Sequence, residues 1–98
     1  MDNNQVLTLI QGEFTPNETI EILFSLINEK IRFHDLQILG IKEGKEGNAE
    51  PHLKRIEELT NTKKAIQELV AKAKQNNNII AVNSSIQLEL KTVEEPVS

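Results

Sequence analysis

The sequence predicts an α+β fold, a two-layer β-α-α-β unit in which an antiparallel strand pair packs on a helical hairpin. Three observations lead to this prediction. β-forming stretches begin and end the 98-residue chain, two long amphipathic stretches lie between them, and a glycine-rich segment separates those two. If the chain reverses direction at each connection, the first and last strands run antiparallel and can pair. We expect a single domain over residues 1–98, because two domains of half this length would each be hard to stabilise.

Residues 5–14 are predicted to form the first strand, because they are rich in β-forming residues and end at a turn signal. Val6 and Ile10 lie on one face of this strand, and Leu7 and Leu9 lie on the other. The first half of the strand is therefore apolar on both faces, and we expect it to be covered on both sides.

The first helix is predicted over residues 16–39. Thr15-Pro16-Asn17-Glu18 combines a threonine N-cap, a proline in the first turn and a glutamate placed for a capping box. One core-facing stripe is expected at helical spacing, formed by Ile20, Leu23, Phe24, Ile27 and Ile31 and widened by Ile22 and Leu26. Residues 30–39 also fit a strand in which Ile31 and Phe33 alternate. Helix is favoured because no glycine or proline interrupts the run before Gly40, the expected stop.

Residues 40–50 are predicted to form an exposed, flexible loop. The stretch from 40 to 51 contains three glycines, one proline and five charged residues in twelve positions. It has little apolar surface to bury, so it is expected to connect two helices without joining the core.

The second helix is predicted over residues 51–75, with Asn48 or Glu50 as its cap and the asparagines at 76–78 as its stop. Its apolar face is expected to consist of Leu53, Ile56, Leu59, Ile66, Leu69, Val70 and Ala73. Lys63 interrupts what would otherwise be a heptad seam, which disfavours a long autonomous coiled coil. A helical-hairpin partner is enough to bury this face.

Residues 79–91 are predicted to form the second strand, because apolar residues recur at every second position from Ile80 to Leu90, except at Ser84. One face of this strand is expected to join the core and the other to be largely wet. Residues 92–98 are expected to be a loose tail.

Composition narrows the classes of function. The chain has no cysteine, which excludes disulfides, thiolate zinc sites and cysteine nucleophiles. Its net charge of −4 argues against a general nucleic-acid binder. No stretch approaches the roughly 18 apolar residues of a membrane span, and the polar N-terminus lacks the features of a signal peptide. A cytoplasmic protein without membrane contact is therefore expected.

One constellation carries metal-binding residue types. His34 and Asp35 lie near the end of the first predicted helix, and His52 lies near the start of the second, so a hairpin can bring them together. Two imidazoles and a carboxylate can bind zinc or another divalent ion. Because the spacing matches no metal motif, surface or capping roles are favoured, and no metal or other cofactor is expected.

The second predicted helix also carries a local excess of positive charge. A phosphate backbone could bind to its lysines, namely Lys63, Lys64, Lys72 and Lys74. A solvated face supported by pairs with neighbouring acids is the simpler interpretation. The serines have no glycine elbow around them, so no catalytic residue is expected and the protein is predicted not to be an enzyme.

A resemblance covers most of the chain. The run Phe14-Thr15-Pro16-Asn17-Glu18 fits the pattern F-[ST]-P-x-E, and residues 26–34 fit the pattern L-I-N-x-K-I-x-F-H. Together with the charged second helix and the closing strand, these runs resemble a family of small uncharacterised bacterial proteins. The resemblance implies a compact cytoplasmic α+β domain. It implies no activity and no functional residue, and it marks only residues 30–34 as a segment to inspect.

The sequence thus predicts a non-enzymatic protein-interaction or self-association module. A homodimer is expected because a two-stranded sheet has two open edges, although an unknown protein partner would also close them. Two alternatives stay open. One is a regulator that binds nucleic acid through the basic second helix, and the other is a metal-binding protein that uses His34, Asp35 and His52.

Overall fold

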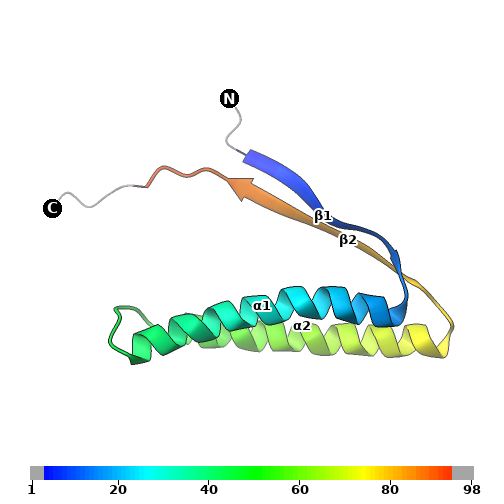
Figure 1. Cartoon of the computed structure of the whole chain (residues 1–98), viewed down its shortest axis with the longest axis horizontal. Coiled ribbons are helices and arrows are strands. Elements are labelled where there is room, and N and C mark those ends of the chain that lie inside the picture. Colours follow the sequence, from blue (N-terminus) through cyan, green and yellow to red (C-terminus); the bar gives the residue numbers. More distant parts are fainter. Residues whose placement is uncertain (1–3, 94–98) are drawn as a thin grey trace. The chain divides into compact units, whose positions relative to one another are not determined.

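The computed structural model describes residues 4–93 and confirms the α+β class. The element order is β1 (Asn4–Phe14), α1 (Pro16–Lys42), α2 (Glu50–Gln75) and β2 (Ile80–Glu89) (Figure 1). The chain forms two compact units. Residues 14–80 make the helical unit, and residues 4–13 with 81–93 make the strand unit. The predicted tail at 92–98 falls mainly on residues 94–98, which lie outside the described residues.

The helix α1 begins at the capping box that the sequence predicts. The Thr15 hydroxyl accepts from the backbone N–H of Glu18 at 3.1 Å, and the Glu18 carboxylate accepts from the backbone N–H of Thr15 at 2.9 Å. Pro16 occupies the first turn, where its missing N–H has no partner to lose. The cap satisfies donors that the first turn leaves free and stabilises the helix by about 1 kcal/mol.

The end of α1 differs from the prediction. Gly40 is helical, and the helix continues to Lys42. A left-handed backbone comes just after the helix, at Gly44, which has a φ of 110°. Glycine adopts this conformation without Cβ strain. A glycine does follow the helix end, but one turn later than expected, and residues 30–39 are helical rather than extended.

The connection between the helices spans residues 43–49 and is shorter than the predicted loop of residues 40–50. The N-cap of α2 is Ala49, which makes no side-chain capping bond, so the expected cap at Asn48 or Glu50 is wrong. The side-chain oxygen of Asn48 accepts from the backbone N–H of Glu50 at 3.0 Å. At the other end of α2, Asn77 takes a left-handed φ of 53°. The helix therefore ends at the asparagine run, as predicted.

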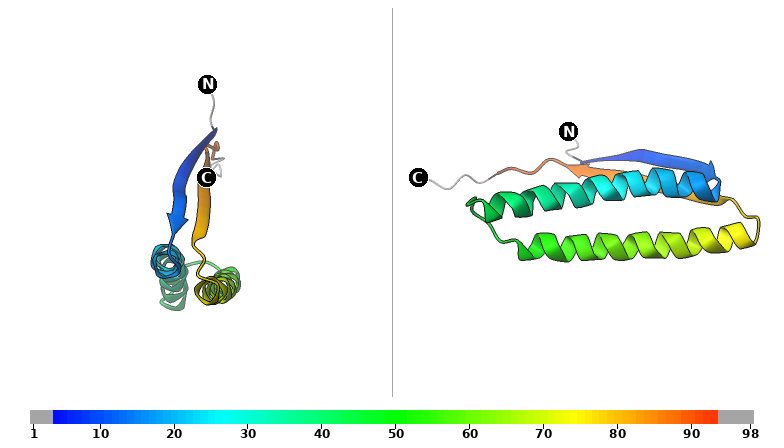
Figure 2. Two further views of the ribbon diagram at one scale, coloured as in Figure 1. Left: turned by 90° about the vertical axis from the view of Figure 1, so that its right-hand side faces the viewer. Right: turned by 60° about the horizontal axis from the view of Figure 1, so that its bottom comes forward.

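The helices α1 and α2 lie side by side and run in opposite directions, which confirms the helical hairpin (Figure 2). Buried and half-buried side chains recur every three or four residues on their facing sides and form a seam. Its α1 members include Leu23, Ile27, Ile31, His34, Ile38 and Ile41, and its α2 members are His52, Ile56, Leu59, Lys63, Ile66, Val70 and Ala73. Neither helix has a stretch long and apolar enough to cross a membrane.

Two leucines predicted on the core face of α2 are in fact exposed. Leu53 is 55% exposed and Leu69 is 54% exposed, so this part of the prediction is wrong. The seam passes instead through His52 and Lys63, which continue the alternating steps of four and three that keep one side of α2 toward α1. The polar character of these two residues hides the register in the sequence.

The strands β1 and β2 pair as an antiparallel two-stranded sheet. Half-buried residues alternate with exposed ones in only part of each strand; they are Ile10, Gly12, Phe14, Ile80, Val82 and Ser84. Ile86, Leu88 and Leu90 are exposed, so the expectation that one face of the second strand joins the core is wrong for its second half. Leu7 and Leu9 are both exposed, so the expectation that this half of β1 is covered on both sides is wrong. No further strand pairs with either edge of the sheet within residues 4–93.

Candidate functional site

The hairpin brings the two histidines of the chain into contact. His34 on α1 and His52 on α2 occupy facing seam positions, and their Nδ1 atoms lie 2.9 Å apart. The ring centroids are 5.1 Å apart and the ring planes are inclined by 49°. A neutral imidazole has one N–H and one bare nitrogen, so one Nδ1 donates and the other accepts. This proximity at the loop end of the hairpin is what the sequence predicts.

His34 is buried, with 8% of its surface exposed. Its ring meets the Phe33 ring edge to face at a centroid distance of 5.3 Å, and its Nε2 has no hydrogen-bond partner among the described residues. Burial lowers the pKa of His34 below the ordinary value of 6.5, and the positive charges of Lys30, of a protonated His52 and of Arg55 lower it further. The site therefore favours the neutral imidazole.

The predicted metal set does not come together as a three-residue cluster. Asp35 is exposed, and it follows His34 directly on α1, where adjacent residues point in different directions. In the part of the chain that the structure describes, no group of three or more histidine, cysteine or acidic side chains is placed to hold a metal ion. The structure thus joins His34 to His52 and leaves Asp35 outside the pair.

A small cavity of about 130 Å³ lies at the loop end of the hairpin, and His52 is part of its lining. Its polar lining also includes Lys45, Glu46 and Asn48. A water molecule takes up about 30 Å³ in the liquid, whereas ligand pockets start at about 300 Å³. The cavity is therefore of a size for a few water molecules and not for a substrate.

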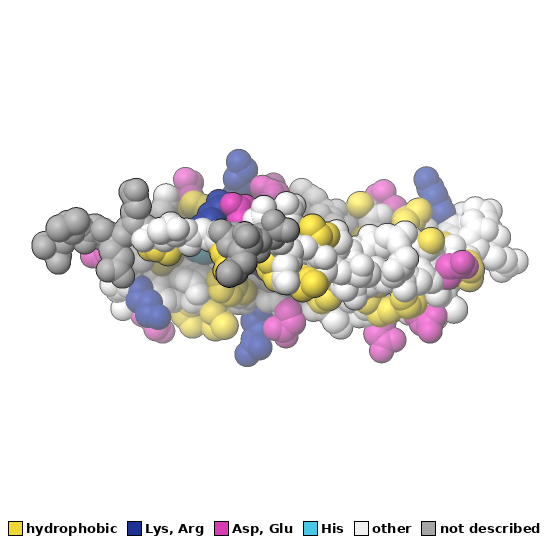
Figure 3. Space-filling view, turned by 90° about the horizontal axis from the view of Figure 1, so that it is seen from above, with side chains coloured by type: hydrophobic (Ala, Val, Ile, Leu, Met, Phe, Trp, Pro, Cys, Tyr) yellow, Lys and Arg dark blue, Asp and Glu magenta, His cyan; other side chains and the backbone are white. Residues whose placement is uncertain are grey.

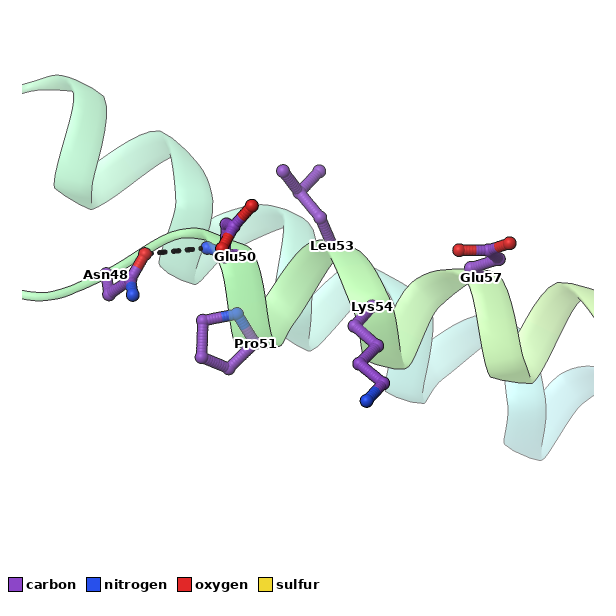
Figure 4. Close-up of a pocket in the computed structure, with 6 residues that line it drawn as sticks. All are labelled: Asn48, Glu50, Pro51, Leu53, Lys54 and Glu57. Carbon is purple, nitrogen blue, oxygen red and sulfur yellow. Dashed lines mark hydrogen bonds between the residues drawn. The ribbon is translucent and has the colours of Figure 1, made fainter.

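A wider surface depression of about 600 Å³ lies at the start of α2 (Figure 4). Its lining consists of Asn48, Glu50, Pro51, Leu53, Lys54 and Glu57. Figure 4 shows Leu53 on the opposite side of the helix from Pro51 and Lys54, so these side chains do not converge on a common point. Because binding and catalysis need convergent polar groups, this depression is a weak candidate for either.

The lysines of the nucleic-acid hypothesis do not share one surface; they are Lys63, Lys64, Lys72 and Lys74. Lys63 is half-buried in the hairpin seam, and the other three are exposed. Lys72 and Lys74 are two residues apart, which turns them to different sides of α2. Glu68, four residues before Lys72, places an acid on the same side of the helix as that lysine. The positive charge is therefore divided and partly neutralised.

A second apolar surface lies on α1, away from the seam, and the sequence interpretation missed it. Its members are Ile22, Leu26, Phe33 and Leu36, which we call the outer stripe. Ile22 is half-buried and the other three are exposed. The signal is present in the sequence, because positions 22, 26, 29, 33 and 36 follow steps of four and three with Glu29 in the middle. The sequence interpretation merges part of this pattern with the core stripe.

On the face shown in Figure 3, hydrophobic side chains lie at the surface among scattered acidic and basic ones. No charged patch of a single sign dominates this view. Comparisons of the chain with protein-family models, with curated proteins and with solved structures gave no match. The resemblance to small uncharacterised bacterial proteins stays a prediction, and the function is inferred from the surfaces that the chain itself presents.

Proposed function

We propose that this chain is a non-enzymatic self-association module that works as a homodimer in the cytoplasm. The observation that supports this proposal is the balance between buried and exposed apolar residues. Among the described residues only four hydrophobic ones are buried, namely Ile38, Leu59, Val70 and Ala73, whereas fourteen large hydrophobic ones are exposed. Contiguous exposed apolar surface marks interaction sites. Its removal from water contributes about 25 cal/mol per Å² to the free energy of association.

The exposed apolar residues lie in both units of the chain. In the strand unit they include Val6, Leu7 and Leu88, in a sheet whose two edges are open within residues 4–93. In the helical unit they include most of the outer stripe. A second copy of the chain supplies the same chemistry to either surface, and two-fold homodimers are the commonest soluble assemblies.

Two features favour a binding role over catalysis. His34 and His52 bond to each other through Nδ1, and the Nε2 of His34 is buried, which keeps that nitrogen away from a substrate. The cavity beside His52 is smaller than a substrate pocket, and the residues around the larger depression do not converge. These features leave the apolar surfaces as the parts of the chain best suited to a function.

Light scattering over at least a hundredfold range of protein concentration tests the proposal. A homodimer is expected to give twice the mass of one chain at high concentration and to dissociate on dilution. Its midpoint of urea unfolding is expected to rise with protein concentration, because only the folded state is stabilised by association. A single-chain mass at every concentration would refute self-association.

A further inference from the structure

We infer that the outer stripe of α1 is the self-association interface and that its occupant is α1 of a second copy, lying antiparallel to the first. This inference rests on the proposed self-association and names its surface. Three observations carry it: the spacing of the stripe, the distribution of charge along α1, and the position of Lys30.

Four positions along the stripe, 26, 29, 33 and 36, are symmetric about position 31, whereas Ile22 would face Gly40 of the second copy. Two copies of α1 can lie antiparallel with a two-fold axis passing between them at the level of position 31. Leu26 of one copy then faces Leu36 of the other, and Glu29 faces Phe33. The steps of four and three keep each of these side chains toward the second helix, as in an antiparallel coiled coil. Two-fold symmetry then repeats every contact.

The charges of α1 favour the antiparallel arrangement. The first half of the helix, residues 16–29, carries three acidic residues and no basic one, and the second half, residues 30–42, carries three basic residues and one acidic one. Antiparallel pairing sets the acidic half of each copy against the basic half of the other. Parallel pairing would set like charges together, which electrostatic complementarity disfavours.

The position of Lys30 explains how Glu29, which interrupts the stripe, is accommodated in the interface. The Nζ of Lys30 lies 4.8 Å from the centroid of the Phe33 ring. In the antiparallel register, Glu29 of the second copy arrives opposite Phe33, beside Lys30. Its carboxylate then meets the Lys30 ammonium near the centre of the interface. A charged residue in the middle of an apolar stripe is thus paired in the dimer.

A matched pair of substitutions tests whether the outer stripe is the interface. Leu36 on the stripe and Leu69 on α2 are both 54% exposed, so replacing either by glutamate has a similar direct effect on the folded chain. Leu36→Glu is expected to weaken the dimer at least about tenfold, as loss of a central apolar contact does. Leu69→Glu is expected to leave the dissociation constant within about twofold of the parent. Circular dichroism checks that both variants stay helical.

Cross-linking tests the register, because the chain has no cysteine of its own. A mixture of Leu26→Cys and Leu36→Cys chains is expected to form a disulfide-linked heterodimer on mild oxidation. Each variant alone is expected not to cross-link, because the two copies of position 26 would lie about 15 Å apart along the helices, well beyond the reach of a disulfide. Parallel pairing predicts the reverse pattern.

The outcomes separate this inference from the proposed function. A dimer that Leu36→Glu does not weaken, or that cross-links in the parallel pattern, refutes the interface and leaves self-association standing. A single-chain mass at every concentration refutes both. If the Leu26→Cys variant of such a monomer also resists alkylation, the stripe is covered within one chain and is no docking surface.

Discussion

The ammonium group of Lys63 donates to the side-chain oxygen of Asn28 at 2.8 Å, across the seam from α2 to α1. The same ammonium lies 5.0 Å from the centroid of the Phe24 ring. The aliphatic part of a lysine can pack along apolar neighbours while its charged end stays near polar groups or an aromatic face. Lys63 thus occupies a seam position with its ammonium group hydrogen-bonded and beside an aromatic ring, at a point where the sequence indicates only an interruption of the heptad pattern.

Replacing Lys63 by leucine is expected to raise the free energy of unfolding by about 1 kcal/mol, because well-packed apolar residues often stabilise a seam more than a partly buried charge does. The Asn28 side chain is exposed and regains water, so no buried group is left unpaired. Urea denaturation measures the change. The Lys63→Ala variant removes the aliphatic stem as well and is expected to be less stable than the parent. A loss of stability in both variants would show that the ammonium contacts dominate.

Truncation of Val70 tests the register of α2. Val70 is 2% exposed, so Val70→Ala is expected to lower the free energy of unfolding by about 1 to 2 kcal/mol through lost burial and a residual cavity. Leu53→Ala on the same helix is expected to cost less than about 0.5 kcal/mol, because the leucine is already exposed. A larger loss of thermal stability at Leu53 than at Val70 would instead support the register that the sequence predicts, in which Leu53 faces the core.

Stability is expected to fall as the pH is lowered, because of His34. Burial and nearby positive charges hold the pKa of His34 below 6.5 in the folded chain, so the unfolded chain binds the proton more readily. The contribution of this group is complete above pH 6.5 and decreases as the pH falls toward the lowered pKa. If the ring whose Nδ1 accepts is the one that binds the added proton, two N–H donors face each other at the contact between His34 and His52.

The His34→Gln variant provides the control for this pH dependence. Urea unfolding of the parent and the variant between about pH 7.5 and about pH 5.5 separates His34 from carboxylates, which titrate in both proteins. The parent is expected to lose more stability than the variant over this range. Equal losses in the two proteins would mean that His34 titrates alike in the folded and unfolded chains.

Two glycines at the end of α1 are expected to respond in opposite ways to alanine. Gly44 has a φ of 110° and no atom within 4 Å of an added Cβ. Gly44→Ala therefore introduces backbone strain without a steric clash and is expected to lower the free energy of unfolding by about 1 to 2 kcal/mol. Gly40 is helical, and its added Cβ would meet only the flexible side chain of Lys45, at 3.1 Å. Gly40→Ala is expected to stabilise by up to about 1 kcal/mol. Melting temperatures that shift in the same direction would contradict this difference.

The features that sequence predicts well here are local ones. The capping box at Thr15 and Glu18 depends on four consecutive residues, and the asparagine stop of α2 depends on three, so each could be identified before any tertiary contact was known. The choice of Gly44 over Gly40 as the left-handed residue depends on where packing along the seam ends. Composition marks both glycines equally and does not distinguish them.

The candidate sites show the same limit. The meeting of His34 with His52 follows from the hairpin and was predictable, but the exclusion of Asp35 depends on helix phase at one residue. The outer stripe was missed because α1 has two apolar stripes, and periodicity alone does not say which of them faces α2. The polar seam residues His52 and Lys63 disguise the phase of α2 in the same way.

The two units differ in the length of chain that separates their paired elements. The helices α1 and α2 are joined by residues 43–49, whereas β1 and β2 meet only after residues 15–79 have been brought back on themselves. Closing a short connection loses little chain entropy, so the hairpin is expected to fold first and to bring the strands within reach of each other. Translation makes β1 before either helix and β2 after both. The first strand, apolar on both faces near its start, therefore waits without its pairing partner while the rest of the chain is synthesised.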